Sequence, residues 1–166
     1  MKQGEYAQTD QYYYLQQDKG LKVIITGAPV KKELDRIDKI LELCKTNPIN
    51  LSGALTLKHL ACLSSKAKLF FGVDTAPMHM AAATNTPVIA LFGASFPVIW
   101  GPWNNDSDKV SFQDKDGFQT NDLHYVISNM NHEIFYIDQI KKTRGMNLIT
   151  LKQNKDAFFE ILKNIE

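Results

Sequence analysis

The sequence has few of the residues that build metal sites or disulfide bonds. It contains two cysteines, Cys44 and Cys62, and no Cys-x-x-Cys pair. Its four histidines are scattered along the chain, so the spacing predicts no metal site. Both cysteines lie among apolar residues in helical patterns, and we expect two small buried thiols.

Strong charge and long apolar runs are also missing. The formal net charge of the 166-residue chain is +1, which argues against binding to nucleic acid or an anionic membrane. Eighteen apolar residues never occur in succession, so no transmembrane segment is predicted. The polar, Tyr-rich residues 1–18 lack the apolar centre of a signal peptide. We therefore expect a cytoplasmic protein, and the length predicts a single domain over residues 1–166.

Short apolar runs alternate with helical patterns over the first hundred residues. Strands are predicted over residues 21–26, 69–73 and 88–92, with a brief one over 49–51. Helices are predicted over 31–45, 56–66 and 77–83. This alternation favours an α/β fold, a Rossmann-like parallel sheet with helices on both faces. A helix-like segment, Thr9 to Lys19, precedes the first strand, which is unusual for such a fold.

The pattern weakens beyond Gly101. Residues 104–131 are predicted to be a long loop region, with at most one short strand near residues 110–112. Residues 133–144 are predicted to be helical, despite their β-branched and aromatic content. A C-terminal helix is predicted over 150–166, with Thr150 as its N-cap.

One strand-to-helix corner combines several features of an anion-binding site. A strand is predicted to end at Val73, and Asp74 or Thr75 would cap the next helix, whose first turn contains Pro77. Ligands of open α/β sheets bind at the carboxyl ends of the strands, and the amides and dipole of a helix start suit a phosphate. The same residue types also begin helices that bind no ligand. A single histidine near a helix start, such as His79, is more often structural than functional.

The motifs around this corner resemble glycosyltransferase family 9, the ADP-heptose:lipopolysaccharide heptosyltransferases. The family's D-T-G-x-x-H element, Ala-rich helix, T-P-V-x-x-L-F-G run and W-G-P-W-like segment occur here in order. They are Asp74-Thr75-Ala76-Pro77-Met78-His79, Ala81-Ala82-Ala83, Thr86-Pro87-Val88 with Leu91-Phe92-Gly93, and Trp100-Gly101-Pro102-Trp103. Weaker similarities upstream extend the resemblance over residues 20–103. Ala76 stands where the family has glycine.

The resemblance implies the C-terminal, donor-binding half of a two-domain GT-B glycosyltransferase that transfers heptose, with inversion, from ADP-heptose to the lipopolysaccharide inner core. It implies that Asp74, Thr75, Ala76 and His79 contact the diphosphate and sugar, that Leu55 lines the adenine pocket, and that Met78 and Gly93 shape the wall. No cofactor or metal is implied.

The resemblance identifies no catalytic residue in this chain. The family's general base belongs to the N-terminal domain, which also binds the lipopolysaccharide acceptor and is absent from this sequence. A separate N-terminal-domain chain is therefore an expected partner. The resemblance also implies a cytoplasmic protein that acts at the inner face of the bacterial inner membrane.

Three other interpretations stay open at this point. The first is a non-catalytic ADP-sugar-binding module or inactive fragment that needs a separate N-terminal half. The second is a GT-B protein of the nucleotide-sugar epimerase type. The third is an α/β binding domain that binds no nucleotide. A preference for UDP over ADP would favour the epimerase type.

Overall fold

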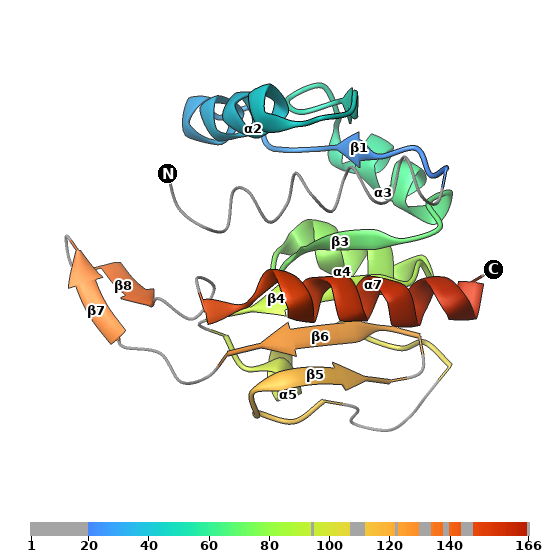
Figure 1. Ribbon diagram of the computed structural model, residues 1–166, viewed down its shortest axis with the longest axis vertical. Coiled ribbons are helices and arrows are strands. Elements are labelled where there is room, and N and C mark those ends of the chain that lie inside the picture. The colour runs from blue at the N-terminus through green and yellow to red at the C-terminus, as the bar shows by residue number, and fades with distance from the viewer. Residues whose placement is uncertain are drawn as a thin grey trace. The chain divides into compact units, whose positions relative to one another are not determined.

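A computed structural model describes residues 20–93, 95–106, 112–121, 123–129, 134–137, 140–143 and 148–165 (Figure 1). The chain divides into two compact units, Met1–His59 and Leu60–Glu166, which are described in turn. The helix-like segment from Thr9 to Lys19 lies outside the described residues.

The first unit is a short β-α-β element. The strands β1 (Ile24–Ile25) and β2 (Ile49–Asn50) pair in parallel, and α2 (Lys31–Leu43) connects them. One face of α2 buries Ile37 and Ile40, while charged residues cover the remainder of the helix. The predicted order of strand, helix and strand is confirmed, with strands of two residues each.

The helix α3 (Leu57–Ser65) begins in the first unit and ends in the second. The Thr56 Oγ1 atom accepts a hydrogen bond from the His59 amide at 3.2 Å, which confirms the predicted N-cap. The expectation for the two thiols is wrong, because Cys62 on α3 is exposed and Cys44 after α2 is only half-buried. The partial burial of Cys44 raises its pKa.

The second unit contains a four-stranded sheet in the order β3-β4-β6-β5. The three strands β3 (Phe70–Val73), β4 (Val88–Phe92) and β6 (Tyr125–Ser128) are parallel, and β5 (Gly117–Thr120) runs antiparallel to β6. Helix α4 (Ala76–Ala83) connects β3 to β4. The predicted α/β fold with a mostly parallel sheet is confirmed, and the antiparallel strand at its edge was not predicted.

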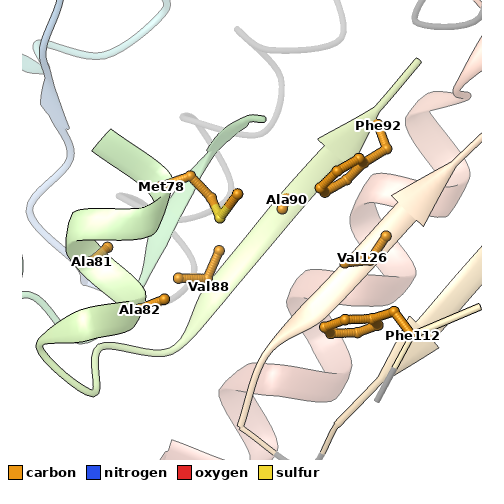
Figure 2. Close-up of a cluster of buried hydrophobic side chains, with 8 residues drawn as sticks. All are labelled: Met78, Ala81, Ala82, Val88, Ala90, Phe92, Phe112 and Val126. Atoms are coloured by element: carbon orange, nitrogen blue, oxygen red, sulfur yellow. The ribbon is translucent and has the colours of Figure 1, made fainter. Parts of the chain in front are cut away.

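Helices cover both faces of this sheet. On one face, α4 packs on β3 and β4, and a buried cluster that extends to β6 (Figure 2) consists of Met78, Ala81, Ala82, Val88, Ala90, Phe92, Phe112 and Val126. On the other face, α7 (Leu151–Ile165) buries Ala157, Phe158, Ile161 and Leu162, and the Phe158 ring lies 5.1 Å from that of Phe71. The small alanines of α4 allow its close approach to the sheet.

The predicted N-cap of α7 is confirmed. The Gln153 amide donates to Thr150 Oγ1 at 3.3 Å, and Gln153 Oε1 accepts from the Thr150 amide at 2.8 Å. These two reciprocal bonds form a capping box, which satisfies two backbone donors at the start of the helix.

Two predictions for the C-terminal half are wrong. Residues 104–131, predicted as a loop region, contain β5 and β6. Residues 133–144, predicted as helical, contain the antiparallel strands β7 (Ile134–Ile137) and β8 (Ile140–Thr143). In both places, β-branched and aromatic residues follow their preference for strands.

The connection from β4 to β5 crosses one face of the sheet. It leaves the carboxyl end of β4, forms the short helix α5 (Pro97–Trp100), and reaches the amino end of β6, where His124 binds the Trp103 carbonyl oxygen. Gly101 packs against the Phe112 ring, so this connection lies on the same face as α4.

Candidate functional site

The candidate site begins where β3 ends. The Asp74 amide continues the ladder between β3 and β4 by donating to the Leu91 carbonyl oxygen at 3.3 Å. Thr75 then occupies the N-cap position of α4 with extended backbone angles (φ −153°, ψ 167°). Its hydroxyl donates back to the Val73 carbonyl oxygen at 3.3 Å and makes no bond to the helix amides. The expected side-chain cap is therefore absent from Thr75, and the start of α4 receives no such cap.

Ala76, which stands where the family has glycine, fits its position without backbone strain. Among the described residues, Asn85 is the one non-glycine residue with a positive φ, so Ala76 needs no glycine conformation. Pro77 follows in the first turn and has no amide hydrogen, and the amides of Met78 and His79 both bond to the Thr75 carbonyl oxygen. The backbone of the corner is thereby fixed before any ligand arrives.

Asp74 and His79 form the charged centre of this corner. The Asp74 Oδ1 atom lies 3.5 Å from His79 Nε2, and the two side chains are 20% and 41% exposed. A carboxylate in this position orients the imidazole ring through its Nε2 atom. Both groups stay accessible enough to meet a ligand, so the pair can offer a hydrogen-bond acceptor and an oriented ring at the helix start.

The structure brings four of the seven predicted site residues together, namely Asp74, Thr75, Ala76 and His79. Gly93 lies just beyond β4, the parallel neighbour of β3, and is therefore at the same edge of the sheet. It is buried, and its role in the wall of a donor site stays a prediction.

Two predicted residues have other positions. Met78 is fully buried in the core cluster under the corner, so its side chain supports the site from the core rather than forming a surface for a ligand. Leu55 belongs to the first unit, where it lies half-buried between β2 and α3.

The Trp100-Gly101-Pro102-Trp103 segment lies away from this corner, and its contacts were not predicted. The turn between β5 and β6 holds it from one side. The fully buried His124 ring bonds through Nε2 to the Trp103 carbonyl oxygen at 2.9 Å, and Asn121 Nδ2 donates to the Pro102 carbonyl oxygen at 3.4 Å. Burial lowers the pKa of His124 to about 4, although the bond to Trp103 opposes this shift.

Asn105, two residues further on, binds the end of α4. Its side-chain Nδ2 atom donates to the Ala82 carbonyl oxygen at 3.3 Å and also contacts Asn85 Oδ1. Asn85 has a φ of 57°, the left-handed conformation that ends many helices. Thr86 Oγ1 then donates to the Ser64 carbonyl oxygen at 2.7 Å, which joins the ends of α3 and α4. The run Asn85-Thr86-Pro87 is therefore explained by the termination of α4.

The described part of the chain contains neither a metal-binding cluster nor a membrane-spanning helix. These residues include no group of three or more His, Cys, Asp or Glu side chains placed to hold a metal ion. Within the same residues, no helix has the length and apolar character needed to cross a membrane.

Sequence comparison matches residues 12–124 to the family described as glycosyltransferase family 9 (heptosyltransferase). The lipopolysaccharide heptosyltransferase 3 of Escherichia coli is 44% identical over 89 residues, which cover 53% of this chain and 26% of that protein. The lipopolysaccharide core heptosyltransferase OpsX of Haemophilus influenzae is 38% identical over 91 residues, 55% of this chain and 26% of that protein. This chain therefore spans about a quarter of the length of the curated relatives it matches.

Solved structures show the same fold. The glycosyl transferase family 9 structure from Veillonella parvula DSM 2008 superposes with a TM-score of 0.68 at 22% sequence identity, and covers 96% of this chain and 41% of that chain. The Escherichia coli ADP-heptose lps heptosyltransferase II gives a TM-score of 0.66 at 21% identity, with the same coverage. The family match contains the motifs of residues 20–103 and extends past both ends of that range.

Proposed function

Because the chain belongs to glycosyltransferase family 9, the heptosyltransferases, we propose that it is the donor-binding part of a lipopolysaccharide heptosyltransferase and that its donor is ADP-heptose. The observation that carries the proposal is the corner between β3 and α4. It combines an uncapped helix start with the Asp74–His79 pair at the carboxyl edge of a parallel sheet.

The helix start suits the diphosphate of the donor. Pro77 has no amide hydrogen, and the Met78 and His79 amides bond to the Thr75 carbonyl oxygen, so the Ala76 amide and the positive end of the α4 dipole are what this corner offers to negative charge. Negative charge grows on the departing diphosphate as the glycosidic bond breaks. Donors fixed in place at this point lower the energy of the transition state more than that of the bound substrate.

Asp74 and His79 suit the sugar and the phosphate respectively. A carboxylate repels phosphate oxygens but accepts hydrogen bonds from sugar hydroxyls, so we assign Asp74 to the heptose. Its contact with His79 orients the imidazole ring, and we assign the Nε2 atom of that ring to an oxygen of the diphosphate. Gly93 would form part of the wall of this site, and the assignment of Leu55 to the adenine stays a prediction from the family resemblance.

Transfer with inversion to the inner core requires an acceptor site and a general base. This chain offers no residue that we assign to the base, since the pair at the corner is placed on the donor. We therefore propose that the acceptor binds through a second half, as part of a longer chain or as a partner chain. We propose that the transfer reaction takes place in the cytoplasm, at the inner face of the inner membrane.

Calorimetric titration of the 166-residue chain with ADP tests the donor site. ADP should bind, UDP should bind more weakly, and Asp74→Ala should change the affinity for the ADP-sugar more than that for ADP. Asp156→Ala, which removes an exposed carboxylate from α7, is the matched control and should leave both affinities unchanged. A folded chain that binds neither nucleotide would refute a working donor site.

A second candidate is a module that binds the ADP-sugar without turnover, which the Asp74–His79 pair at the helix start would suit equally well. Assays with ADP-heptose and a lipopolysaccharide acceptor separate the two candidates. Release of ADP that depends on the acceptor supports transfer, whereas binding without release supports the module. Tighter binding of UDP than of ADP would instead favour an epimerase-type protein.

A further inference from the structure

One buried side chain of the second unit carries a polar atom that the fold does not satisfy. Asn154 of α7 is 5% exposed, and its Oδ1 atom has no hydrogen-bond partner among the described residues. By contrast, the buried side chains of Thr86, Gln119 and Ser128 each bond to a backbone carbonyl oxygen. The buried His124 ring is held through one of its nitrogens. An unsatisfied buried oxygen costs stability, so its presence on α7 calls for a physical reason.

Asn154 lies on the face of α7 that packs on the sheet. Asn154, Phe158 and Ile161 are spaced as residues i, i+4 and i+7, and all three are buried. The Asn154 backbone amide bonds to the Thr150 carbonyl oxygen at 3.2 Å, and the capping box of Thr150 and Gln153 satisfies the start of the helix. The group in need of a partner is therefore the side-chain amide, and not the helix terminus.

The contact between the Phe158 and Phe71 rings fixes the level of Asn154 on the sheet. In Figure 1, α7 runs along β6 against the direction of its arrow, so α7 begins near the carboxyl ends of the parallel strands. Asn154 precedes Phe158 by about one helical turn, or about 6 Å, which equals about two residues of a strand. Two residues beyond Phe71, β3 ends at Val73. Helical side chains lean towards the helix start, so the Asn154 amide points to this carboxyl edge.

The same edge carries the corner that begins at Asp74. The Asn129 amide donates to the Phe92 carbonyl oxygen at 3.2 Å, so Asn129 and Gly93 continue the ladder between β6 and β4 by one step. Phe92 belongs to the cluster under α4, and strand residues alternate between the faces of a sheet, so this step faces α7. Gly93 adds no side chain there. The polar groups at this edge are therefore Asp74 on the side of α4, and Asn129 and Asn154 on the side of α7.

We propose that the Asn154 side chain binds a hydroxyl group of the ADP-sugar. This inference rests on the proposed function, which places the ADP-sugar at this edge, where ligands of open α/β sheets bind. The Oδ1 atom needs a hydrogen-bond donor, which a hydroxyl group offers and an ionised phosphate does not. The soft χ2 torsion of asparagine lets the amide turn towards the ligand at little cost. The ligand then supplies the partner that the fold lacks, so the free protein gives up stability for binding.

Asn154→Leu tests the assignment, because leucine has the same branched shape and no polar atom. The midpoint of urea unfolding of the free chain should stay the same or rise, since the substitution removes no internal bond of Oδ1. Calorimetric titration should show about fivefold weaker binding, the effect of one lost hydrogen bond. Equal losses for ADP and ADP-heptose would assign the hydroxyl to the ribose, and a loss for ADP-heptose alone would assign it to the heptose. Asp156→Leu places the same side chain on the exposed face of α7 and should leave both affinities unchanged.

Asn154→Ala, which cannot clash with the sheet, should show the same loss of affinity and guards against a leucine that is too large. Unchanged affinities in both Asn154 variants would overturn the inference, whatever happens to the unfolding midpoint. If Asp74→Ala weakens binding of the ADP-sugar and the Asn154 variants do not, this inference alone fails. A folded wild type that binds neither ADP nor ADP-heptose would overturn the proposed function together with it.

Discussion

The sharpest physical prediction concerns the pH dependence that His124 gives to the stability of the protein. The ring is fully buried, donates through Nε2 to the Trp103 carbonyl oxygen, and has no recorded hydrogen-bond partner at Nδ1 among the described residues. A second proton on Nδ1 would place a charge in the core without a partner, which is why the pKa of His124 is lowered to about 4.

The sign of the effect follows from proton binding. An unfolded histidine titrates near pH 6.5, so between pH 6.5 and 4 the unfolded chain binds the proton and the folded chain does not. Lowering the pH through this window therefore destabilises the fold, and the loss is complete below about pH 4. A pKa difference between 6.5 and about 4, at 1.36 kcal/mol per unit, corresponds to about 3 kcal/mol.

The assay compares the wild type with His124→Gln in urea unfolding followed by tryptophan fluorescence at a series of pH values. Glutamine reaches the Trp103 carbonyl oxygen with its own amide but cannot be protonated. Carboxylates titrate in both proteins, so the difference between the two free energies of unfolding isolates His124. It should shift by about 3 kcal/mol in favour of the variant between pH 7 and 4. A difference that stays constant over this range would refute the burial argument.

Three further substitutions test the packing, each by urea unfolding. Gly101→Ala should cost about 2 kcal/mol, because its Cβ would overlap both the Phe112 ring and the Pro97 carbonyl oxygen; an unchanged midpoint would contradict this packing. Thr86→Val should cost about 2 kcal/mol, since the Ser64 carbonyl oxygen loses its 2.7 Å hydrogen bond, and Thr86→Ser should restore most of it. Phe92→Ala should cost about 4 kcal/mol by leaving a cavity in the core, and a loss under 1 kcal/mol would contradict the packing.

The sequence was most informative where hydrophobic periodicity and local capping act alone. The strand over Val88–Phe92 is a continuous apolar run, and all five of its residues are buried. The N-caps Thr56 and Thr150 were identified from their position just before an apolar helical pattern, and both bind the expected amides. These features depend on neighbours within four residues and need no knowledge of the remaining chain.

Strands β5 and β6 were missed because their pairing is not local. The run Tyr125–Ser128 is short and stands among polar residues, yet it becomes fully buried because β4 and α7 cover it. Strand β5 pairs antiparallel with β6. Its short sequence mixes exposed and buried residues, and such a sequence is also typical of a surface loop. Tertiary contacts of this kind override weak local signals.

The corner was predicted from its sequence motif, but its hydrogen bonds were not. Asp74 and His79 do meet, at 3.5 Å. The hydroxyl of Thr75 turns back to the Val73 carbonyl oxygen instead of capping the helix, and a one-dimensional pattern cannot distinguish these two bonds. The contacts of His124 were likewise beyond prediction, because its partner Trp103 is 21 residues away.

The connection that crosses the sheet from β4 to β5 has a consequence for protein engineering. A segment that links secondary structure elements usually tolerates inserted residues, because it lies on the surface and carries few contacts. Here the segment itself serves as the covering layer, with Pro97 and Pro102 buried beneath it and Asn105 bound to the end of α4. A tag or epitope placed at these residues would uncover the core, so insertions between residues 95 and 105 should be tolerated as poorly as insertions within a helix.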